Sequence, residues 1–158
     1  MNPKIIFEDN NFFVVEKPSG WITDASNTTN NQPVIQKWIA DNFKTEINGF
    51  DREAGYILRN GVVHRLDKET SGLLLIAKTK VAFEGLQRQF KERLVHKTYI
   101  ALVHGDVKPH GGEINEPVGR LPWRRDRFGV MVGGREAITL YNVIANYQSL
   151  ITKESLTL

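Results

Sequence analysis

The chain has 158 residues, of which 41% are hydrophobic and 25% are charged, so it has the composition of a globular protein and the length of one domain. It contains no cysteine, which excludes a disulfide scaffold, a thiolate zinc site and a cysteine nucleophile. The N-terminus lacks the apolar segment of a signal peptide, and no run is long enough to span a membrane. We therefore expect a cytoplasmic protein with no membrane partner.

The net charge of +3 is unevenly distributed along the chain. Residues 1–60 hold 6 Lys and Arg against 8 Asp and Glu, which gives −2. Residues 61–158 hold 15 against 10, which gives +5. The positive charge therefore lies in the part of the chain that also holds the polar motif described below.

The N-terminal third predicts a β-hairpin followed by a helix. Residues 5–7 and 12–15 are short apolar runs on either side of the polar residues 8–11, which is typical of two strands and a turn. Lys17-Pro18-Ser19-Gly20 then ends the second strand, because proline and glycine favour turns. Residues 33–43 carry apolar side chains at helical spacing, and a proline in the first position suits the opening turn.

Two loops are expected around this helix. Residues 26–32 are rich in Asn and Thr, and residues 44–60 are weakly patterned and rich in glycine and charge. Neither segment has the periodicity of a strand or a helix.

The most informative segment follows, where a dense polar insert separates two apolar runs. Residues 62–63 and 73–77 predict buried strands, and residues 70–72 predict a sharp turn whose glycine is free to adopt a positive φ. Arg65 and Asp67 lie in the insert. A break between two strands holds such side chains on a rigid frame and leaves them exposed, as is usual for residues of a functional site.

This segment, His-Arg-Leu-Asp-x-x-Thr-Ser-Gly-Leu-Leu over residues 64–74, resembles the motif of the RluA-type pseudouridine synthases, which isomerise uridine within RNA. The similarity is ungapped over eleven residues, so a chance match is far rarer than for a short motif. The early Lys17-Pro18-x-Gly20 and the later Lys97-x-Tyr99 are also similar to that family. His64 indicates this subgroup, because the related small-subunit class typically has glycine there.

The resemblance implies roles for three residues. Asp67 would be the catalytic carboxylate, either as a nucleophile or as the group that stabilises a cationic sugar. Arg65 would bind RNA where the target nucleotide is extruded from its stack. Tyr99 would pack on the uracil ring and assist removal of the C5 proton. The implied partner is structured RNA, either ribosomal or transfer RNA, and the reaction needs no cofactor.

Several alternatives remain open for these residues. Arg65 and Asp67, two apart, share one strand face and could form a surface ion pair of little energetic weight. Tyr99 could be a core residue, and His64 a hydrogen-bonded structural residue. Asp67 and Glu69 could form the carboxylate pair of a glycosidase. The chain could also be an RNA-binding protein of the same fold without catalysis.

A helix and several strands are expected after the motif. Thr79 predicts the N-cap of a helix over residues 80–93, in which Phe83, Leu86 and Phe90 form one apolar face. A turn at Gly111-Gly112 precedes the later strands. Strands are predicted over residues 97–103, 113–118, 128–132 and 137–145, and a last one begins at Ser155.

The densest basic run is residues 120–127, which predicts an RNA contact. Arg124, Arg125 and Arg127 are the predicted RNA-binding residues, and Trp123 lies among them. Cations suit phosphates, and an aromatic ring suits stacking on a base. The alternative is a solvated hairpin tip whose tryptophan folds back on the core.

A metal site is not expected. His96, His104 and His110 lack a compact metal-ligand spacing and have no cysteine partners.

Strands without regular helix alternation predict an α+β fold with a mixed, largely antiparallel sheet, flanking helices and a catalytic cleft. We expect residues 1–158 to form one catalytic domain that acts as a monomer. The family pattern continues with a Thr-Gly-Arg-x-His-Gln-Ile-Arg-like segment, whose basic residue pairs with the catalytic aspartate, and nothing here matches it. We therefore expect the domain to be incomplete at its C-terminus, with its last strands missing, and to bind RNA weakly with little catalysis.

Overall fold

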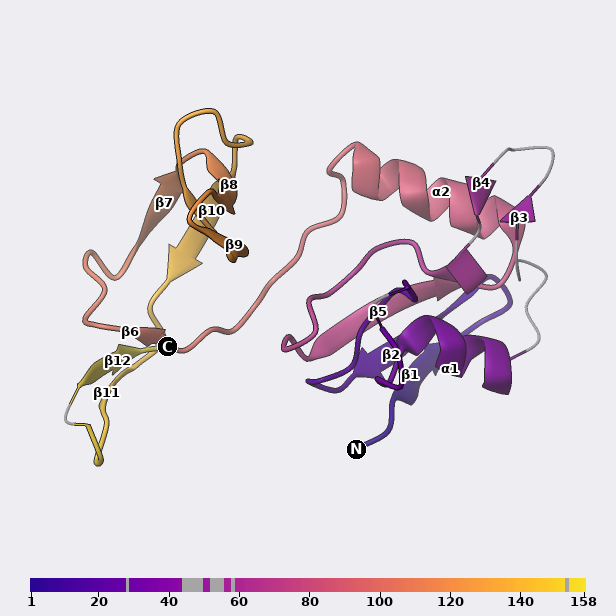
Figure 1. Cartoon of the computed structure of the whole chain (residues 1–158), viewed down its shortest axis with the longest axis horizontal. Coiled ribbons are helices and arrows are strands. Elements are labelled where there is room, and N and C mark those ends of the chain that lie inside the picture. Colours follow the sequence, from indigo (N-terminus) through magenta and orange to yellow (C-terminus); the bar gives the residue numbers. More distant parts are fainter. Residues whose placement is uncertain (28, 44–49, 52–55, 58, 153) are drawn as a thin grey trace. The chain divides into compact units, whose positions relative to one another are not determined.

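The computed structural model describes all residues other than 28, 44–49, 52–55, 58 and 153. They form two compact units, Met1–His96 and Lys97–Leu158 (Figure 1). The first unit contains β1 (Lys4–Glu8), β2 (Phe12–Lys17), α1 (Ile35–Asn42), β3 (Phe50–Asp51), β4 (Tyr56–Ile57), the 3-10 turn Arg59–Gly61, β5 (Gly72–Ala77) and α2 (Lys80–Lys91). The second contains β6 (Val103–His104), β7 (Gly111–Asn115), β8 (Val118–Leu121), β9 (Arg124–Val130), β10 (Ile138–Asn142), β11 (Asn146–Gln148) and β12 (Ser155–Thr157).

A three-stranded sheet in the order β1-β2-β5 is the frame of the first unit. The predicted hairpin is confirmed, because β1 and β2 pair antiparallel across a turn at Asp9. The Asp9 carboxylate accepts hydrogen bonds from the backbone N–H groups of Asn11 and Phe12 at 2.7 and 2.8 Å. These two bonds lower the pKa of Asp9. The predicted strand over residues 73–77 is also confirmed, as β5, which pairs with β2.

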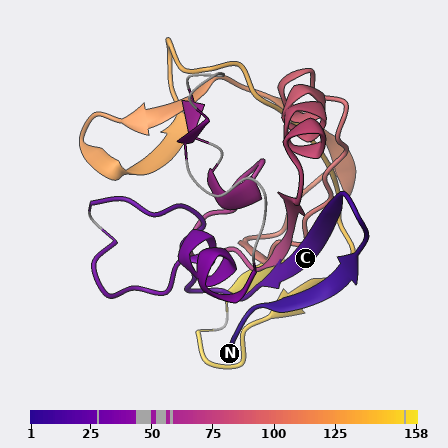
Figure 2. The same cartoon turned by 90° about the vertical axis from the view of Figure 1, so that its right-hand side faces the viewer.

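Helix α1 covers one face of this sheet (Figures 1 and 2). Side chains alternate across a strand, so every second residue of β2 and β5 points to the same face. On this face Phe13 and Val15 of β2 and Ile76 of β5 pack with Ile35 and Ile39 of α1, and all five are fully or almost fully buried. This cluster is the main hydrophobic core of the unit.

Helix α2 packs against the alternate residues of β5. Phe83 of α2 is fully buried against Ala77 and Val63. The predicted cap is confirmed, because the Thr79 side chain accepts a hydrogen bond from the Ala82 N–H at 3.2 Å. The helix ends at Lys91 rather than at residue 93, because residue 93 adopts a positive φ of 59° that a helix does not accommodate.

The loop predicted over residues 44–60 is only partly correct. Residues 44–49, 52–55 and 58 lie outside the described residues, but β3 pairs antiparallel with β4 and Arg59–Gly61 forms a 3-10 turn. A two-residue strand is too short to show an alternating pattern, so the sequence carries no signal for it.

The second unit contains three small sheets, in the orders β10-β7, β11-β12-β6 and β8-β9. The strand predicted over residues 97–103 is wrong for all but its end, since β6 is Val103–His104 and pairs with β12. Residues 97–102 have an apolar pattern, but a strand also needs a neighbour to accept its hydrogen bonds. The strand predicted from Ser155 is confirmed as β12.

Three further strands differ in their bounds from the prediction. Gly111 and Gly112 begin β7 instead of forming a turn, because they pair with Asn142 and Tyr141 of β10. The predicted strand 128–132 starts earlier and ends earlier, as β9, and includes Arg124, Arg125 and Arg127 of the basic run. The predicted strand 137–145 is shorter and corresponds to β10.

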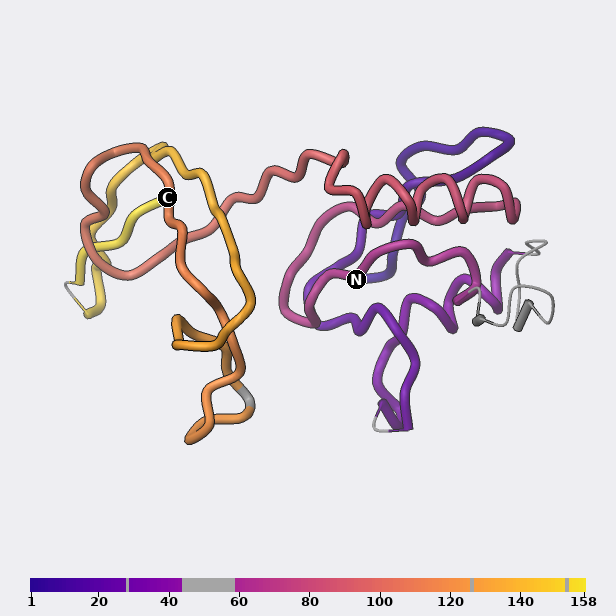
Figure 3. The backbone as a smooth tube through the Cα atoms, turned by 90° about the horizontal axis from the view of Figure 1, so that it is seen from above, coloured from indigo at the N-terminus to yellow at the C-terminus, as the bar shows by residue number. Residues whose placement is uncertain are grey.

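The α+β class is confirmed, and all pairings between the named strands of the described chain are antiparallel. The described strands pair in five small sheets, of which three belong to the second unit. The helices belong to the first unit, and the backbone of each unit can be followed in Figure 3.

Candidate functional site

Asp67 lies in the loop that leaves the core at Leu66 and re-enters the sheet at Gly72, the first residue of β5. Leu66 is buried and Asp67 is exposed, so the chain reaches the surface within one residue. The backbone N–H of Thr70 donates to the carbonyl of Asp67 at 3.1 Å, which closes a turn. The φ of +136° at Gly72 agrees with the predicted sharp return to the sheet.

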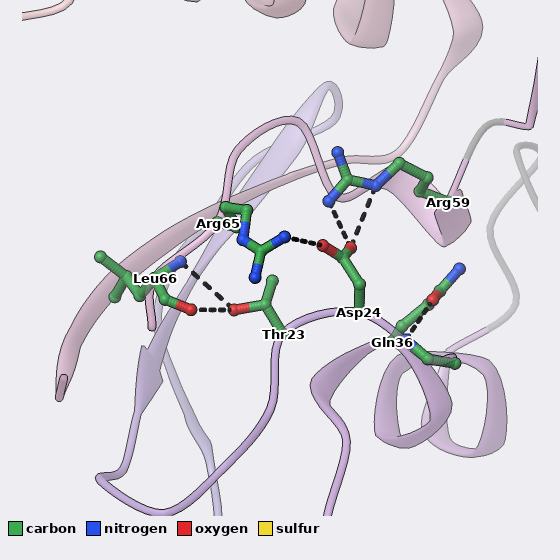
Figure 4. A network of polar contacts seen from close by, with 7 residues as sticks. Thr23, Asp24, Gln36, Arg59, Arg65 and Leu66 are labelled. Carbon is green, nitrogen blue, oxygen red and sulfur yellow. Dashed lines mark hydrogen bonds and ion pairs between the residues drawn. The ribbon is translucent and has the colours of Figure 1, made fainter. Parts of the chain in front are cut away.

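Thr23 fixes the residue before Asp67. Its buried hydroxyl donates to the carbonyl of Leu66 at 2.7 Å and accepts from the N–H of Leu66 at 3.2 Å (Figure 4). One side chain thus satisfies both polar groups of a buried backbone unit, where a lost partner would be costly.

Lys17 fixes the residue after Asp67. Its ammonium group donates to the carbonyl of Lys68 at 3.1 Å and to the carbonyls of Pro18 and Trp21 at 3.1 and 2.8 Å. The N–H of Gly20 also donates to the Lys68 carbonyl, at 2.8 Å. The backbone is therefore held on both sides of Asp67, and the carboxylate is presented to solvent from a fixed position.

Lys17 is also a positive charge beneath the loop. It is fully buried, and burial lowers its pKa. The carboxylates of Glu69 and Asp67 act in the opposite direction and raise the pKa of Lys17. Lys17 is thus close enough to Glu69 and Asp67 for their charges to interact.

From the sequence, Lys17 is expected at the start of a turn, without an electrostatic role. A signal was present, because Lys17 follows Phe13 and Val15 at two-residue spacing and therefore shares their buried face. A lysine in that phase is buried only where acceptors surround its ammonium group.

Arg65 is paired with Asp24 rather than with Asp67. Its Nη1 lies 4.0 Å from Oδ2 of Asp24, and this is the ion pair recorded for Arg65 among the described residues (Figure 4). Arg59 binds the other oxygen of the same carboxylate, with Nε donating to Oδ1 at 3.0 Å. Asp24 cannot be singled out from the sequence, because nothing in its local pattern points to Arg59 or Arg65.

His64 connects the motif to the core. Its Nε2 accepts a hydrogen bond from the N–H of Leu75 at 3.1 Å, and its ring stacks on Phe90 with centroids 4.4 Å apart. These contacts agree with the structural alternative considered for this histidine.

Tyr99 belongs to the second unit, whereas Asp67 and Arg65 belong to the first. Its side chain is 57% exposed and lies outside any strand, which does not agree with the alternative of a core residue. The proposed catalytic role of Tyr99 and the catalytic cleft remain predictions.

The basic run forms the β8–β9 hairpin of the second unit, which projects from the rest of that unit (orange in Figure 3). Arg120 stabilises the hairpin, since its guanidinium lies 4.8 Å from the centre of the Phe128 ring and donates to the carbonyl of Arg125. Trp123 is in the turn and is 75% exposed, so it does not fold back on a core within this unit. Arg124, Arg125 and Arg127 are exposed on β9.

Within the part of the chain that the structure describes, no group of three or more His, Asp or Glu side chains is arranged to hold a metal ion. None of the helices described is long and apolar enough to cross a membrane.

Comparison with known proteins identifies close relatives of the chain. Residues 11–157 match the family model for RNA pseudouridylate synthase. A protein of Aquifex aeolicus named uncharacterized RNA pseudouridine synthase is 40% identical over 91% of this chain and 44% of its own length. The ribosomal large subunit pseudouridine synthase D of Nitrosomonas europaea is 35% identical over 91% of this chain and 39% of its own length. The chain thus spans less than half the length of these two relatives.

The solved structure of human RNA pseudouridylate synthase domain containing 1 has the same fold. It superposes with a TM-score of 0.65 over 99% of this chain and 57% of its own, at 24% sequence identity. This similarity supports the α+β class predicted from the sequence.

We predict that Thr23→Val lowers the free energy of unfolding by about 2–3 kcal/mol, because the isosteric side chain leaves the buried N–H and carbonyl of Leu66 without partners. Thr23→Ser keeps the hydroxyl and should cost only about 1 kcal/mol for the lost methyl group. Chemical denaturation followed by circular dichroism measures both. Equal losses for the two variants would show that the hydroxyl does not hold the loop.

Proposed function

Because the chain belongs to the RNA pseudouridylate synthase family, we propose that its protein converts uridine to pseudouridine in structured RNA, with Asp67 as the catalytic carboxylate. The reaction breaks the bond between N1 and C1′, turns the base, joins C5 to C1′ and removes the C5 proton. N1 ends with a proton that C5 has lost, so no oxidant, reductant or energy source is consumed.

The proposal rests on one observation, that the exposed carboxylate of Asp67 is attached to a fixed backbone. Asp67 is exposed between two residues whose backbone groups are held by Thr23 and Lys17. A carboxylate that must attack a sugar carbon, or stabilise a positive charge on it, gains most from such an arrangement because its orientation is set before the substrate binds.

The other site residues take roles that follow from their chemistry. Arg65 contacts the RNA where the target nucleotide leaves its stack, for which a planar, exposed and charged group is suited. Tyr99 packs on the uracil ring and its hydroxyl assists removal of the C5 proton. Arg124, Arg125 and Arg127 bind phosphates through the exposed hairpin.

The substrate class and the setting are part of the same proposal. Ribosomal RNA is favoured, because a relative from Nitrosomonas europaea is named as a ribosomal large subunit enzyme. We also propose a cytoplasmic monomer in which the two units are parts of one catalytic domain, and a reaction that uses neither a cofactor nor a metal ion.

One observation favours a second function, RNA binding without catalysis. The exposed cations and Trp123 of the hairpin all lie in the second unit, and Asp67 lies in the first. RNA binding by the hairpin would therefore not require the carboxylate, and variants of Asp67 distinguish the two functions.

Asp67→Asn should abolish isomerisation, lowering turnover by about a thousand-fold or more, the range seen when a catalytic nucleophile is removed. The assay is tritium release from 5-tritiated uridine in ribosomal RNA transcripts by the protein expressed from its complete gene. Glu69→Gln is the matched control, since it removes one carboxylate from the same loop, and it should retain activity. Turnover by Asp67→Asn at the wild-type rate would refute the assignment.

Tyr99→Phe should leave RNA affinity within about two-fold and lower turnover by about a hundred-fold, because the ring is kept while the proton-transfer group is lost. Tyr141→Phe serves as control, since its hydroxyl donates to the carbonyl of Pro109 at 3.2 Å and has a structural contact instead. Single-turnover tritium release and filter binding measure the two effects. Unchanged turnover by Tyr99→Phe would exclude the hydroxyl as the base.

Replacing Arg124 and Arg125 by Gln should weaken RNA binding and reduce the slope of log affinity against log salt by about 1.4–1.8, the value for two lost phosphate contacts. Replacing Lys4 and Lys91 of the first unit changes the net charge equally and should leave the slope unchanged. Equal slopes for the two double variants would mean that the hairpin does not bind phosphates.

A further inference from the structure

Asp24 is the centre of a charged network beside the motif loop. Its carboxylate binds two arginines, with Arg59 on Oδ1 and Arg65 on Oδ2 (Figure 4). Arg59 donates to Oδ1 through both Nε and Nη2, and the Nε distance is 3.0 Å. Arg65 approaches Oδ2 only to 4.0 Å, which is an ion pair without a direct hydrogen bond.

The two arginines differ in how firmly they are held. The side chains of Asp24 and Arg59 are 25% and 30% exposed, so their pair is shielded on most sides. The side chain of Arg65 is 70% exposed. An exposed, distant pair is weak and screened by salt, whereas a shielded and hydrogen-bonded pair is retained.

Helix α1 keeps the Asp24 carboxylate in place. The side chain of Gln36 accepts from the N–H of Ala25 at 2.9 Å, and the N–H of Gln36 donates to the carbonyl of Thr23 at 3.1 Å. The Gln36 carbonyl accepts from the side chain of Asn60 at 3.0 Å. The helix thus holds the backbone on both sides of Asp24 and the turn that carries Arg59.

We propose that Asp24 is a positioning residue that holds Arg65 beside the motif loop in the RNA-free protein and releases it to an RNA phosphate. A carboxylate and a phosphodiester offer the same kind of oxygen to a guanidinium, so an RNA backbone at this surface competes with Asp24 for Arg65. The inference rests on the proposed function in one respect, that Arg65 acts on RNA.

Arg59 explains why the release is feasible. A carboxylate left without a partner would repel the incoming phosphates. Because Arg59 stays on Oδ1 when Arg65 departs, the charge of Asp24 remains compensated at the surface that receives the RNA. Arg59 thus remains bound to Asp24 in both states, whereas Arg65 exchanges between Asp24 and the RNA.

The test is a double-mutant cycle in RNA binding. Asp24→Asn and Arg65→Ala are made singly and together, and affinity for a folded RNA hairpin is measured across a range of salt concentrations. Asp41→Asn is the matched control, because it makes the same charge change at an exposed position of α1. Thermal unfolding of each variant is followed in parallel.

We expect Asp24→Asn to tighten RNA binding by up to about five-fold, the range that an exposed ion pair covers, and Arg65→Ala to abolish this gain. Asp24→Asn should also steepen the dependence of log affinity on log salt concentration. In this variant Arg65 does not have to leave a carboxylate before it binds a phosphate. A merely structural role would weaken binding in both backgrounds. An equal gain with and without Arg65, or the same gain from Asp41→Asn, would show a general charge effect and overturn the inference.

Two further measurements make the result independent of the variants' stability and of catalysis. In the RNA-free protein, nitrogen relaxation at Nε of Arg65 should show greater mobility in Asp24→Asn than in the wild type. In the wild type, the carboxyl carbon resonance of Asp24 should move when the RNA hairpin is added. Unchanged mobility or an unmoved resonance would overturn the inference. Absence of tritium release with the binding cycle intact would instead refute only the proposed enzymatic function.

Discussion

The arrangement of the motif loop depends on hydrogen bonds to the backbone on each side of Asp67. The hydroxyl of Thr23 satisfies both polar groups of Leu66, and the ammonium of Lys17 binds the carbonyl of Lys68. Side chains of residues 17–23 therefore fix the backbone of the motif loop, and the side chain of Asp67 stays exposed. The side chain of an exposed functional residue makes few packing contacts, so its position has to be fixed through the backbone by other residues.

The charged side chains at the site also interact between segments that are distant in sequence. Lys17 on β2 interacts with the carboxylates of the motif loop, and Asp24 binds Arg59 and Arg65. Lys17 is buried, where electrostatic interactions are strong, and Arg65 is exposed, where they are weak. Lys17 is thus held by a buried interaction, whereas the ion pair of Arg65 is exposed.

The sequence predicts those features of the fold that depend on near neighbours. The first hairpin, β5 and the cap at Thr79 follow from alternation, turn residues and a hydroxyl before a helix. Residues 97–102 are mispredicted because an apolar run does not reveal whether a partner strand is present. Asp67 could be singled out from its motif, but Asp24 could not, since its partner Arg59 is 35 positions away and no local pattern connects them.

The contacts around the motif loop close large loops in the chain. Lys17 and Lys68 are separated by 51 positions and Thr23 and Leu66 by 43. Closing such loops costs chain entropy, and the pairing of β2 with β5 holds the same two parts of the chain together. The geometry of the motif loop therefore depends on contacts between segments that are far apart in the chain. Loss of the β2–β5 pairing would therefore remove the contacts that hold the backbone on both sides of Asp67.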